Sequence, residues 1–153
     1  IITSDQLHEK FKPTYDLLNQ KYNLQKHLNY LKTKINCNKS ICSIIMDQKY
    51  FPGVGNYIKS ECLYYSKIHP EEKWGNLNNE TRILLIQNIK KIMSNSYKSG
   101  GAELKDFKNP FNSSKFKLKI YGKKYTEQND LVISKITSDY RKTWFCPKNQ
   151  KLI

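Results

Sequence analysis

Residues 46–57 constrain the fold of this chain more than any other stretch. Pro52 has no N–H and its ring clashes with the preceding helical turn, so a helix cannot run through this position. Gly53 and Gly55 permit backbone angles that a side chain would forbid, and Asn56 is a residue type that favours a helix start. The pattern predicts a helix, a tight turn and a second helix. The start of that second helix would offer N–H groups and a partial positive charge, which together suit a phosphate.

The charge of the chain indicates what such a phosphate would belong to. Lys and Arg number 27 against 13 Asp and Glu, which gives a formal net charge of +14 and a pI near 9.6. A nucleic acid, an anionic membrane surface or an acidic protein would each be attracted to it. An AT-rich genome is a further explanation, because the chain is also rich in Asn, Ile and Tyr. The lysines are spread along the whole chain, so the sign of the charge is informative and its position is not.

The cysteines predict neither a metal site nor a disulfide framework. Cys37, Cys42, Cys62 and Cys146 form no C-x-x-C pair and have no histidines at zinc-finger spacing. Small buried side chains in a reducing, intracellular compartment are the expectation for them. The sequence also has no apolar run of about 18 residues, so we expect no membrane span.

Helical spacing of apolar residues marks the first two thirds of the chain. It predicts helices over residues 3–34, 40–48, 57–67 and 78–99, the first divided into two pieces near Pro13. Asn78 or Asn79 would cap the last of these helices, and Gly100 and Gly101 would end it.

The pattern changes after Gly101. Residues 107–115 read as a loop, and residues 117–121 alternate like a half-buried strand. Two β-rich segments, 131–133 and 142–146, predict an antiparallel hairpin with Arg141 at its tip. We therefore expect a mainly α fold, in which a helical domain of residues 1–110 precedes a β-hairpin module of residues 111–153 that needs support from the helical body.

Four ordered motifs resemble the formamidopyrimidine-DNA glycosylase / endonuclease VIII family. Residues 46–57 with Glu61 and His69-Pro70 are similar to its helix–two-turn–helix (H2TH), and residues 100–107 are similar to the segment after its last long helix. Residues 120–122 resemble the lead-in to its zinc finger, and residues 141–150 resemble the second half of that finger. The resemblance covers nearly the whole chain.

The finger departs from the zinc-bearing pattern. Only Cys146 remains of the four cysteines, and Asn149 stands at the place of the last ligand. One thiolate cannot supply the four ligands of a structural zinc. The resemblance therefore implies a zincless finger held by packing of residues such as Trp144 and Tyr121. Cys42, at a position where the formamidopyrimidine branch usually has a lysine, favours the endonuclease VIII-like branch.

The family's nucleophile has no counterpart here. It is an N-terminal proline amine, followed by a glutamate, in a β-sandwich domain that precedes the helical region. The resemblance implies that this chain is the DNA-binding C-terminal half of a bifunctional base-excision-repair glycosylase and AP lyase acting on oxidised bases and abasic sites. It would contain no catalytic residue and need no cofactor.

The expected DNA contacts come from both parts of the chain. Asn56, assisted by the backbone of Val54 and Gly55, would bind one phosphate, and Arg141 would bind phosphates that flank a flipped nucleotide. Lys49, Lys123 and Lys124 would add contacts to the DNA backbone. The alternatives are a plain helix cap for Asn56 and a solvated turn residue for Arg141. Asp47, Glu61 and His69 are expected to be structural, and Tyr64, Tyr65 and Trp144 to belong to the core.

The expected partner is damaged double-stranded DNA, bound by a monomer in the nucleus or another compartment that holds DNA. The alternative function is a non-catalytic H2TH nucleic-acid-binding module. The finger segment from Arg141 to Pro147 favours the glycosylase.

Overall fold

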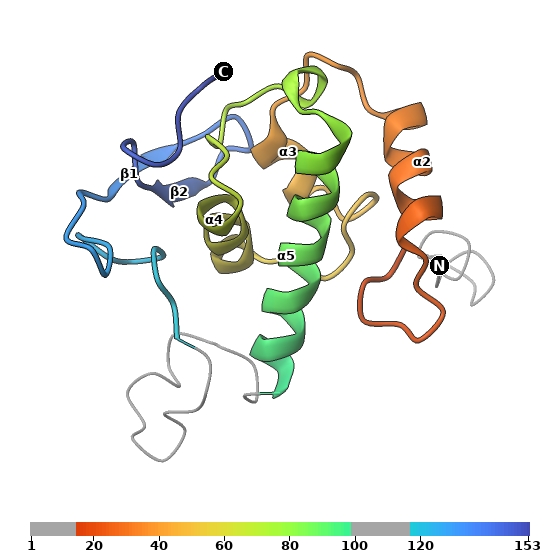
Figure 1. Ribbon diagram of the computed structural model, residues 1–153, viewed down its shortest axis with the longest axis horizontal. Helices are drawn as coiled ribbons and strands as arrows, with labels where there is room; N and C mark the ends of the chain where they lie inside the picture. The colour runs from red at the N-terminus through yellow and green to blue at the C-terminus, as the bar shows by residue number, and fades with distance from the viewer. Residues whose placement is uncertain (1–14, 99–116) are drawn as a thin grey trace.

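The computed structural model describes residues 15–98 and 117–153. A helical body is followed by a smaller, mostly irregular arm, residues 117–153, that carries a two-stranded sheet (Figure 1). The elements, in chain order, are α2 (Leu24–Lys34), α3 (Ile41–Met46), α4 (Asn56–Tyr65), the 3-10 helix η1 (Trp74–Asn76), α5 (Asn79–Lys98), β1 (Ile133–Ile136) and β2 (Lys142–Phe145).

Asparagines begin two of the helices. The Oδ1 atom of Asn23 accepts a 3.0 Å hydrogen bond from the Lys26 N–H at the start of α2. The Oδ1 atom of Asn78 accepts a 2.8 Å bond from the Thr81 N–H at the start of α5, so the cap predicted there is confirmed. The predicted ends of this helix at Gly100 and Gly101, the loop at 107–115 and the break at Pro13 lie outside the described residues.

The helix predicted over residues 3–34 is wrong for residues 15–23, which form turns. The Asp16 carboxylate accepts a hydrogen bond from the Leu18 N–H, and the Asn19 side chain accepts one from the Lys21 N–H. These side chains satisfy backbone groups in a turn and compete with the helical alternative.

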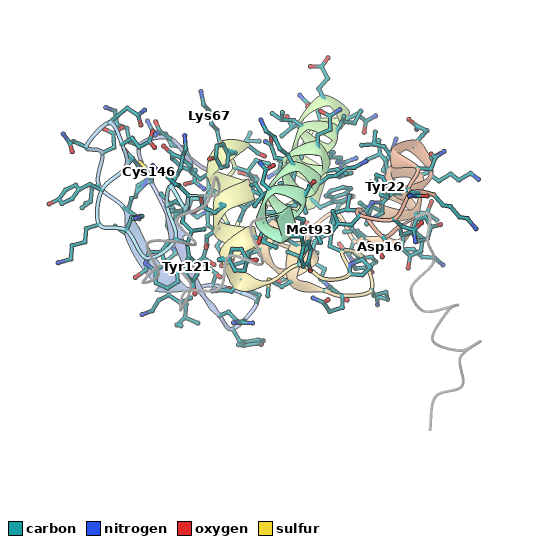
Figure 2. The ribbon with its side chains drawn as sticks, turned by 90° about the horizontal axis from the view of Figure 1, so that it is seen from below. Asp16, Tyr22, Lys67, Met93, Tyr121 and Cys146 are labelled. Carbon is teal, nitrogen blue, oxygen red and sulfur yellow. The ribbon has the colours of Figure 1, made fainter. Side chains whose placement is uncertain are left out.

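Helix α4 lies in the middle of the molecule. It packs against α5 on one side and against β2 on the other. Seen from below, Met93 lies on the α5 side of α4, whereas Tyr121 and Cys146 lie on the side of the arm (Figure 2). Seven of its residues are buried, among them the polar residues Lys59, Ser60 and Glu61. A buried polar group must find a partner inside the protein, so these three side chains decide how the arm attaches.

The main core is built from the helices and the 46–57 turn. Its fully buried members include Leu31, Ile41, Ile44, Ile45, Phe51, Leu63, Leu85 and Ile89. A smaller core in the arm contains Ile120, Val132 and Cys146, with Tyr64 and Trp144 packed against it. Trp144 lies on Tyr121 with their ring centroids 4.4 Å apart, so the predicted packing of these two residues is confirmed.

The predicted hairpin is confirmed, with its first strand shifted to residues 133–136. Ile133 pairs with Phe145 and Ile136 with Lys142 in an antiparallel register. The strand predicted at 117–121 is wrong. The Glu61 carboxylate accepts hydrogen bonds from the consecutive N–H groups of Lys119, Ile120 and Tyr121, at 2.7, 2.8 and 2.8 Å. Those N–H groups are therefore not available to a neighbouring strand.

Two further expectations need correction. Cys42, Cys62 and Cys146 are buried thiols, but Cys37 is exposed. Tyr65 is 41% exposed at the end of α4 and does not belong to the core. Within the described ranges, no helix has the length and apolarity needed to cross a membrane.

Candidate nucleic-acid interface

The turn between α3 and α4 is shaped by the Gln48 side chain. Its Nε2 donates a 3.1 Å hydrogen bond to the Val54 carbonyl, and its Oε1 accepts a 2.8 Å bond from the Gly53 N–H. Gly53 has φ +83°, a left-handed conformation that glycine adopts at little steric cost. The Asp47 carboxylate accepts from the Lys49 N–H, which confirms its predicted capping role. The turn is thus fixed by side chains from its own sequence.

A histidine of helix α2 also holds the turn between α3 and α4. The Nε2 atom of His27 donates a 2.7 Å hydrogen bond to the Tyr50 carbonyl, and its Nδ1 accepts a 2.8 Å bond from the Tyr22 hydroxyl. The carbonyl can only accept, so it determines which ring nitrogen carries the proton. Burial lowers the pKa of His27 to about 4. The imidazole is therefore neutral where it holds the turn.

Gly55, and not Asn56, is the N-cap of α4. The prediction that Asn56 occupies the cap position is wrong by one residue, since Asn56 is the first residue of the helix. A glycine has no side chain with which to satisfy the first N–H groups of the helix. These groups, with the positive end of the helix dipole, form an arrangement that favours an anion.

The Asn56 side chain joins the helical body to the hairpin. Its Nδ2 donates a 2.8 Å hydrogen bond to the carbonyl of Lys142, the first residue of β2. The residue is 9% exposed, and among the described residues its Oδ1 has no hydrogen-bond partner. A plain capping role for Asn56 is therefore wrong. Because Lys142 follows Arg141, this bond links both predicted phosphate-binding residues.

A buried ion pair holds the hairpin turn on α4. The Nζ atom of Lys59 lies 2.6 Å from Oδ2 of Asp139, with the two side chains 0% and 4% exposed. Burial lowers the pKa of Lys59, an effect that the neighbouring Asp139 carboxylate opposes. A buried ammonium needs such a partner, and the Asp139 carboxylate provides it.

A second contact holds the same turn on the segment after α4. The Glu71 carboxylate accepts hydrogen bonds from the Ser138 N–H at 3.1 Å and from the Ser138 hydroxyl at 2.8 Å, and a 3.2 Å bond from the Cys42 thiol. Burial raises the pKa of Glu71, but the hydrogen bonds from Ser138 and Cys42 outweigh this effect and leave the pKa lowered. The charged form is therefore the one that binds Ser138.

Arg141 lies at the exposed end of this turn, as predicted. Its carbonyl accepts hydrogen bonds from the Thr137 N–H at 3.1 Å and the Thr137 hydroxyl at 3.0 Å, so its backbone is fixed. The guanidinium, a planar donor suited to phosphate oxygens, stands beside the buried ion pair.

The three predicted lysines are all exposed but occupy different segments. Lys49 lies in the 46–57 turn with its Nζ 5.0 Å from the centre of the Tyr50 ring. Lys123 and Lys124 lie in the arm, just after the left-handed Gly122. A role for these lysines in DNA binding stays a prediction, as it does for Val54 and Gly55.

Sequence reasoning missed four residues that shape this surface: Gln48, Lys59, Glu71 and Asp139. Lys59 stands next to the apolar Ile58 in a predicted helix, but the sequence carries no signal that its side chain is buried. The other three act on partners far along the chain or through the geometry of the turn. Glu61 and His69 are structural, as predicted, since the His69 Nδ1 accepts from the Glu71 N–H.

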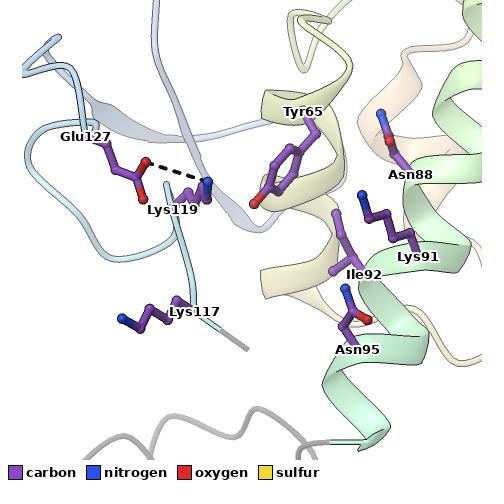
Figure 3. Close-up of a pocket in the computed structure, with 8 residues that line it drawn as sticks. All are labelled: Tyr65, Asn88, Lys91, Ile92, Asn95, Lys117, Lys119 and Glu127. Atoms are coloured by element: carbon purple, nitrogen blue, oxygen red, sulfur yellow. Dashed lines mark ion pairs between the residues drawn. The ribbon is translucent and has the colours of Figure 1, made fainter. Parts of the chain in front are cut away.

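A separate cavity of about 330 Å³ lies between α4, α5 and the arm (Figure 3). Lys91, Lys117 and Lys119 line it with Tyr65, and Lys119 pairs with Glu127 at 3.6 Å. None of the predicted DNA-binding residues lines it. Across residues 15–98 and 117–153 there is also no group of three His, Cys, Asp or Glu side chains that would hold a metal ion.

Comparison with known families decides the identity of the fold. The formamidopyrimidine-DNA glycosylase H2TH domain matches residues 14–108. The chain belongs to the formamidopyrimidine-DNA glycosylase family. The predicted family and the predicted fold class are thereby confirmed.

Formamidopyrimidine-DNA glycosylases from bacteria are among the relatives. That of Rickettsia felis is 35% identical over 127 residues, a match that covers 78% of this chain and 45% of the relative. That of Zymomonas mobilis is also 35% identical, with 80% of this chain and 47% of the relative covered. The chain thus spans about half the length of these relatives. Their names do not test the endonuclease VIII-like assignment, which stays a prediction.

Solved structures of the family show the same architecture. A viral DNA glycosylase is 30% identical, with a TM-score of 0.75 over 91% of this chain and 50% of its own. Lactococcus lactis formamidopyrimidine-DNA glycosylase in complex with abasic-site DNA is 24% identical, with a TM-score of 0.77 over 98% of this chain and 57% of its own. The second likeness concerns the fold alone.

Proposed function

We propose that this chain is the DNA-binding half of a base-excision-repair DNA glycosylase and AP lyase. The observation that supports this most directly is the hydrogen bond from Asn56 to Lys142, which places an uncapped helix start and Arg141 at one junction. A helix start and a guanidinium are both phosphate-binding groups. Two such groups held at a fixed separation would grip a DNA strand at two phosphates.

Each group would have a distinct task on the DNA. The Asn56 amide has two N–H donors, one of which is used by Lys142, and the second would bind a phosphate together with the N–H groups of Val54 and Gly55. Arg141 would bind the phosphates around a flipped nucleotide with its planar donors. Lys49, Lys123 and Lys124 would add salt-dependent contacts to the DNA backbone.

The bond-breaking chemistry would belong to a preceding β-sandwich domain. A proline amine there would attack C1′ of the damaged nucleotide and form a Schiff base, after which the base and then the strand are cleaved. In this proposal residues 1–110 form the H2TH domain and residues 111–153 a zincless finger, in a protein that acts as a monomer. The protein would act in a reducing, intracellular compartment that holds DNA, with Cys37, Cys42, Cys62 and Cys146 as free thiols.

Gel-shift titration of the 153-residue chain on duplex DNA with one abasic site tests the DNA-binding proposal. Asn56→Ala and Arg141→Ala should each weaken binding by about 1–3 kcal/mol, the range for hydrogen bonds to charged groups. Lys148→Ala is the matched control, because it removes one positive charge from the same arm at a side chain that is 72% exposed. Lys148→Ala should bind like the parent, and if Asn56→Ala and Arg141→Ala do so too, the interface is wrongly placed.

Borohydride trapping tests the enzymatic part on a protein that also carries the first domain. A covalent protein–DNA adduct supports the glycosylase and lyase. Salt-dependent DNA binding without such an adduct would favour a non-catalytic H2TH module instead.

A further inference from the structure

Tyr140 occupies a position in the hairpin turn that ordinarily belongs to glycine or asparagine. The Tyr140 N–H donates a 2.8 Å hydrogen bond to the Thr137 carbonyl, and the Thr137 N–H donates a 3.1 Å bond to the Arg141 carbonyl. Tyr140 has φ +63°. This is the three-residue hairpin loop in which a tight turn is followed by one left-handed residue. A bulky aromatic residue is unfavourable in that conformation, since its Cβ crowds the backbone.

The Tyr140 ring is not buried by the fold, so packing does not compensate for this strain. It is 90% exposed, the largest exposed fraction among the large hydrophobic side chains of the described residues. The side chains before it are all hydrogen-bonded to other parts of the protein. Ser138 binds Glu71, Asp139 binds Lys59, and the Thr137 hydroxyl is hydrogen-bonded to the Thr143 hydroxyl. Tyr140 and Arg141 are exposed residues of a turn whose other side chains are anchored by hydrogen bonds.

A strained residue that contributes no packing, on a turn held by two charged contacts, is typical of a functional position. Arg141, the next residue in the chain, indicates which ligand the Tyr140 ring would contact. Arg141 is the proposed phosphate-binding residue, so DNA bound there would bring its bases close to the exposed Tyr140 ring. Around a flipped nucleotide the adjacent bases lose a stacking partner, and an aromatic ring can replace it at little loss of side-chain entropy.

We propose that Tyr140 is a DNA-contacting residue whose ring stacks on a base next to the phosphate bound by Arg141. This inference rests on the proposed function and adds a contact that is not electrostatic. Arg141 would supply charge and position, whereas Tyr140 would recognise an unstacked base and so favour damaged over intact duplex.

Substitutions at Tyr140 separate this role from a structural one. Tyr140→Gly and Tyr140→Asn relieve the left-handed backbone, so both should keep or raise the melting temperature. Both should nevertheless weaken binding to abasic-site DNA on the order of tenfold, the effect of losing one base–aromatic stack. Tyr140→Phe and Tyr140→Trp should bind like the parent, because each keeps an aromatic face.

The salt dependence of binding distinguishes stacking from charge. Across a series of salt concentrations, Tyr140→Gly should shift the affinity without changing the slope of log affinity against log salt. Arg141→Ala should reduce that slope by about one, as the loss of one phosphate contact does. Tyr125→Ala is the control for removal of an exposed tyrosine, since Tyr125 is 59% exposed elsewhere on the arm.

The outcomes are separable. If Arg141→Ala weakens binding and Tyr140→Gly and Tyr140→Asn bind within twofold of the parent, the stacking role is wrong and the proposed function stands. The stacking role is also wrong if affinity falls only together with the melting temperature. If the parent chain does not bind DNA at all, both proposals fail.

Discussion

Asn56 and Lys142 are 86 residues apart in the chain and are joined by a 2.8 Å hydrogen bond from Nδ2 to the carbonyl oxygen. The bond spans the junction between the helical body and the hairpin. It makes the position of Arg141 depend on the start of α4, since Arg141 and Lys142 share a peptide bond. Two phosphate-binding groups connected in this way should not act independently.

A double-mutant cycle between Asn56→Ala and Arg141→Ala measures this dependence. Independent sites would give additive losses of DNA affinity, within about 0.3–0.5 kcal/mol. We expect a coupling energy of about 1 kcal/mol, with the double variant weakened by less than the two single losses together, because Asn56→Ala already displaces Arg141. Equilibrium titration on abasic-site DNA provides the four affinities. Additivity would show that the two residues bind phosphates separately.

The Lys59–Asp139 pair predicts a large and asymmetric effect on stability. Lys59→Met leaves a buried carboxylate without its ammonium and should lower the free energy of unfolding by about 3–5 kcal/mol. The double variant Lys59→Met/Asp139→Asn removes both charges and should recover most of that loss. Urea unfolding at pH 7 measures both. A double variant no more stable than Lys59→Met would show that the pair contributes by packing and not by charge.

The same double variant tests what the pair does for binding. If the ion pair fixes the turn that carries Arg141, the refolded double variant should still bind DNA less tightly than the parent. Recovery of stability with full recovery of affinity would assign the pair to folding alone.

His27 predicts how stability depends on pH. Burial lowers its pKa in the folded chain from 6.5 to about 4. Between these values the unfolded chain binds a proton on His27 and the folded chain does not, so the free energy of unfolding falls as the pH falls from 6.5 to 4. The full loss is about 3 kcal/mol. Urea titrations at pH 7, 5.5 and 4.5 measure it.

His27→Gln separates this effect from the titration of carboxylates. Glutamine can still donate a hydrogen bond to the Tyr50 carbonyl but has no charge to gain. Its stability should therefore change less between pH 6.5 and 4 than that of the parent. Equal pH dependence in both proteins would assign the acid sensitivity to other groups.

The parts of this fold that could be predicted from sequence are those fixed by local chemistry. Pro52 and Gly53 determine the turn within a few residues, and Asn78 caps α5 from the position next to it. The hairpin follows from β-rich segments on either side of Thr137–Arg141. Each of these signals involves residues that are only a few positions apart in the sequence.

The remaining features depend on contacts far along the chain. Residues 117–121 alternate like a strand, but their N–H groups bind the carboxylate of Glu61, 58 to 60 residues away. Asn56 is a residue type that often caps helices, yet its side chain donates a hydrogen bond to a carbonyl in the hairpin. Nothing in the sequence pairs Lys59 with Asp139, because two charged residues 80 apart have many alternative partners. The candidate site lies where these long-range contacts meet, so its geometry could not be predicted from the sequence.

Glu61 provides the last prediction, since it attaches the arm to α4. Its Oε1 accepts from the Lys119 N–H and its Oε2 from the N–H groups of Ile120 and Tyr121. In Glu61→Gln one acceptor oxygen becomes an NH₂ group that faces an N–H donor, which leaves a buried donor unsatisfied. The free energy of unfolding should fall by about 1–3 kcal/mol. Glu80→Gln, at an exposed glutamate in the first turn of α5, removes only a helix-dipole interaction and should change it by about 0.3–1 kcal/mol. Amide hydrogen exchange locates the effect. Faster exchange at Lys119, Ile120 and Tyr121, with α2 unchanged, would confirm that Glu61 holds the arm. Uniformly faster exchange throughout the chain would contradict it.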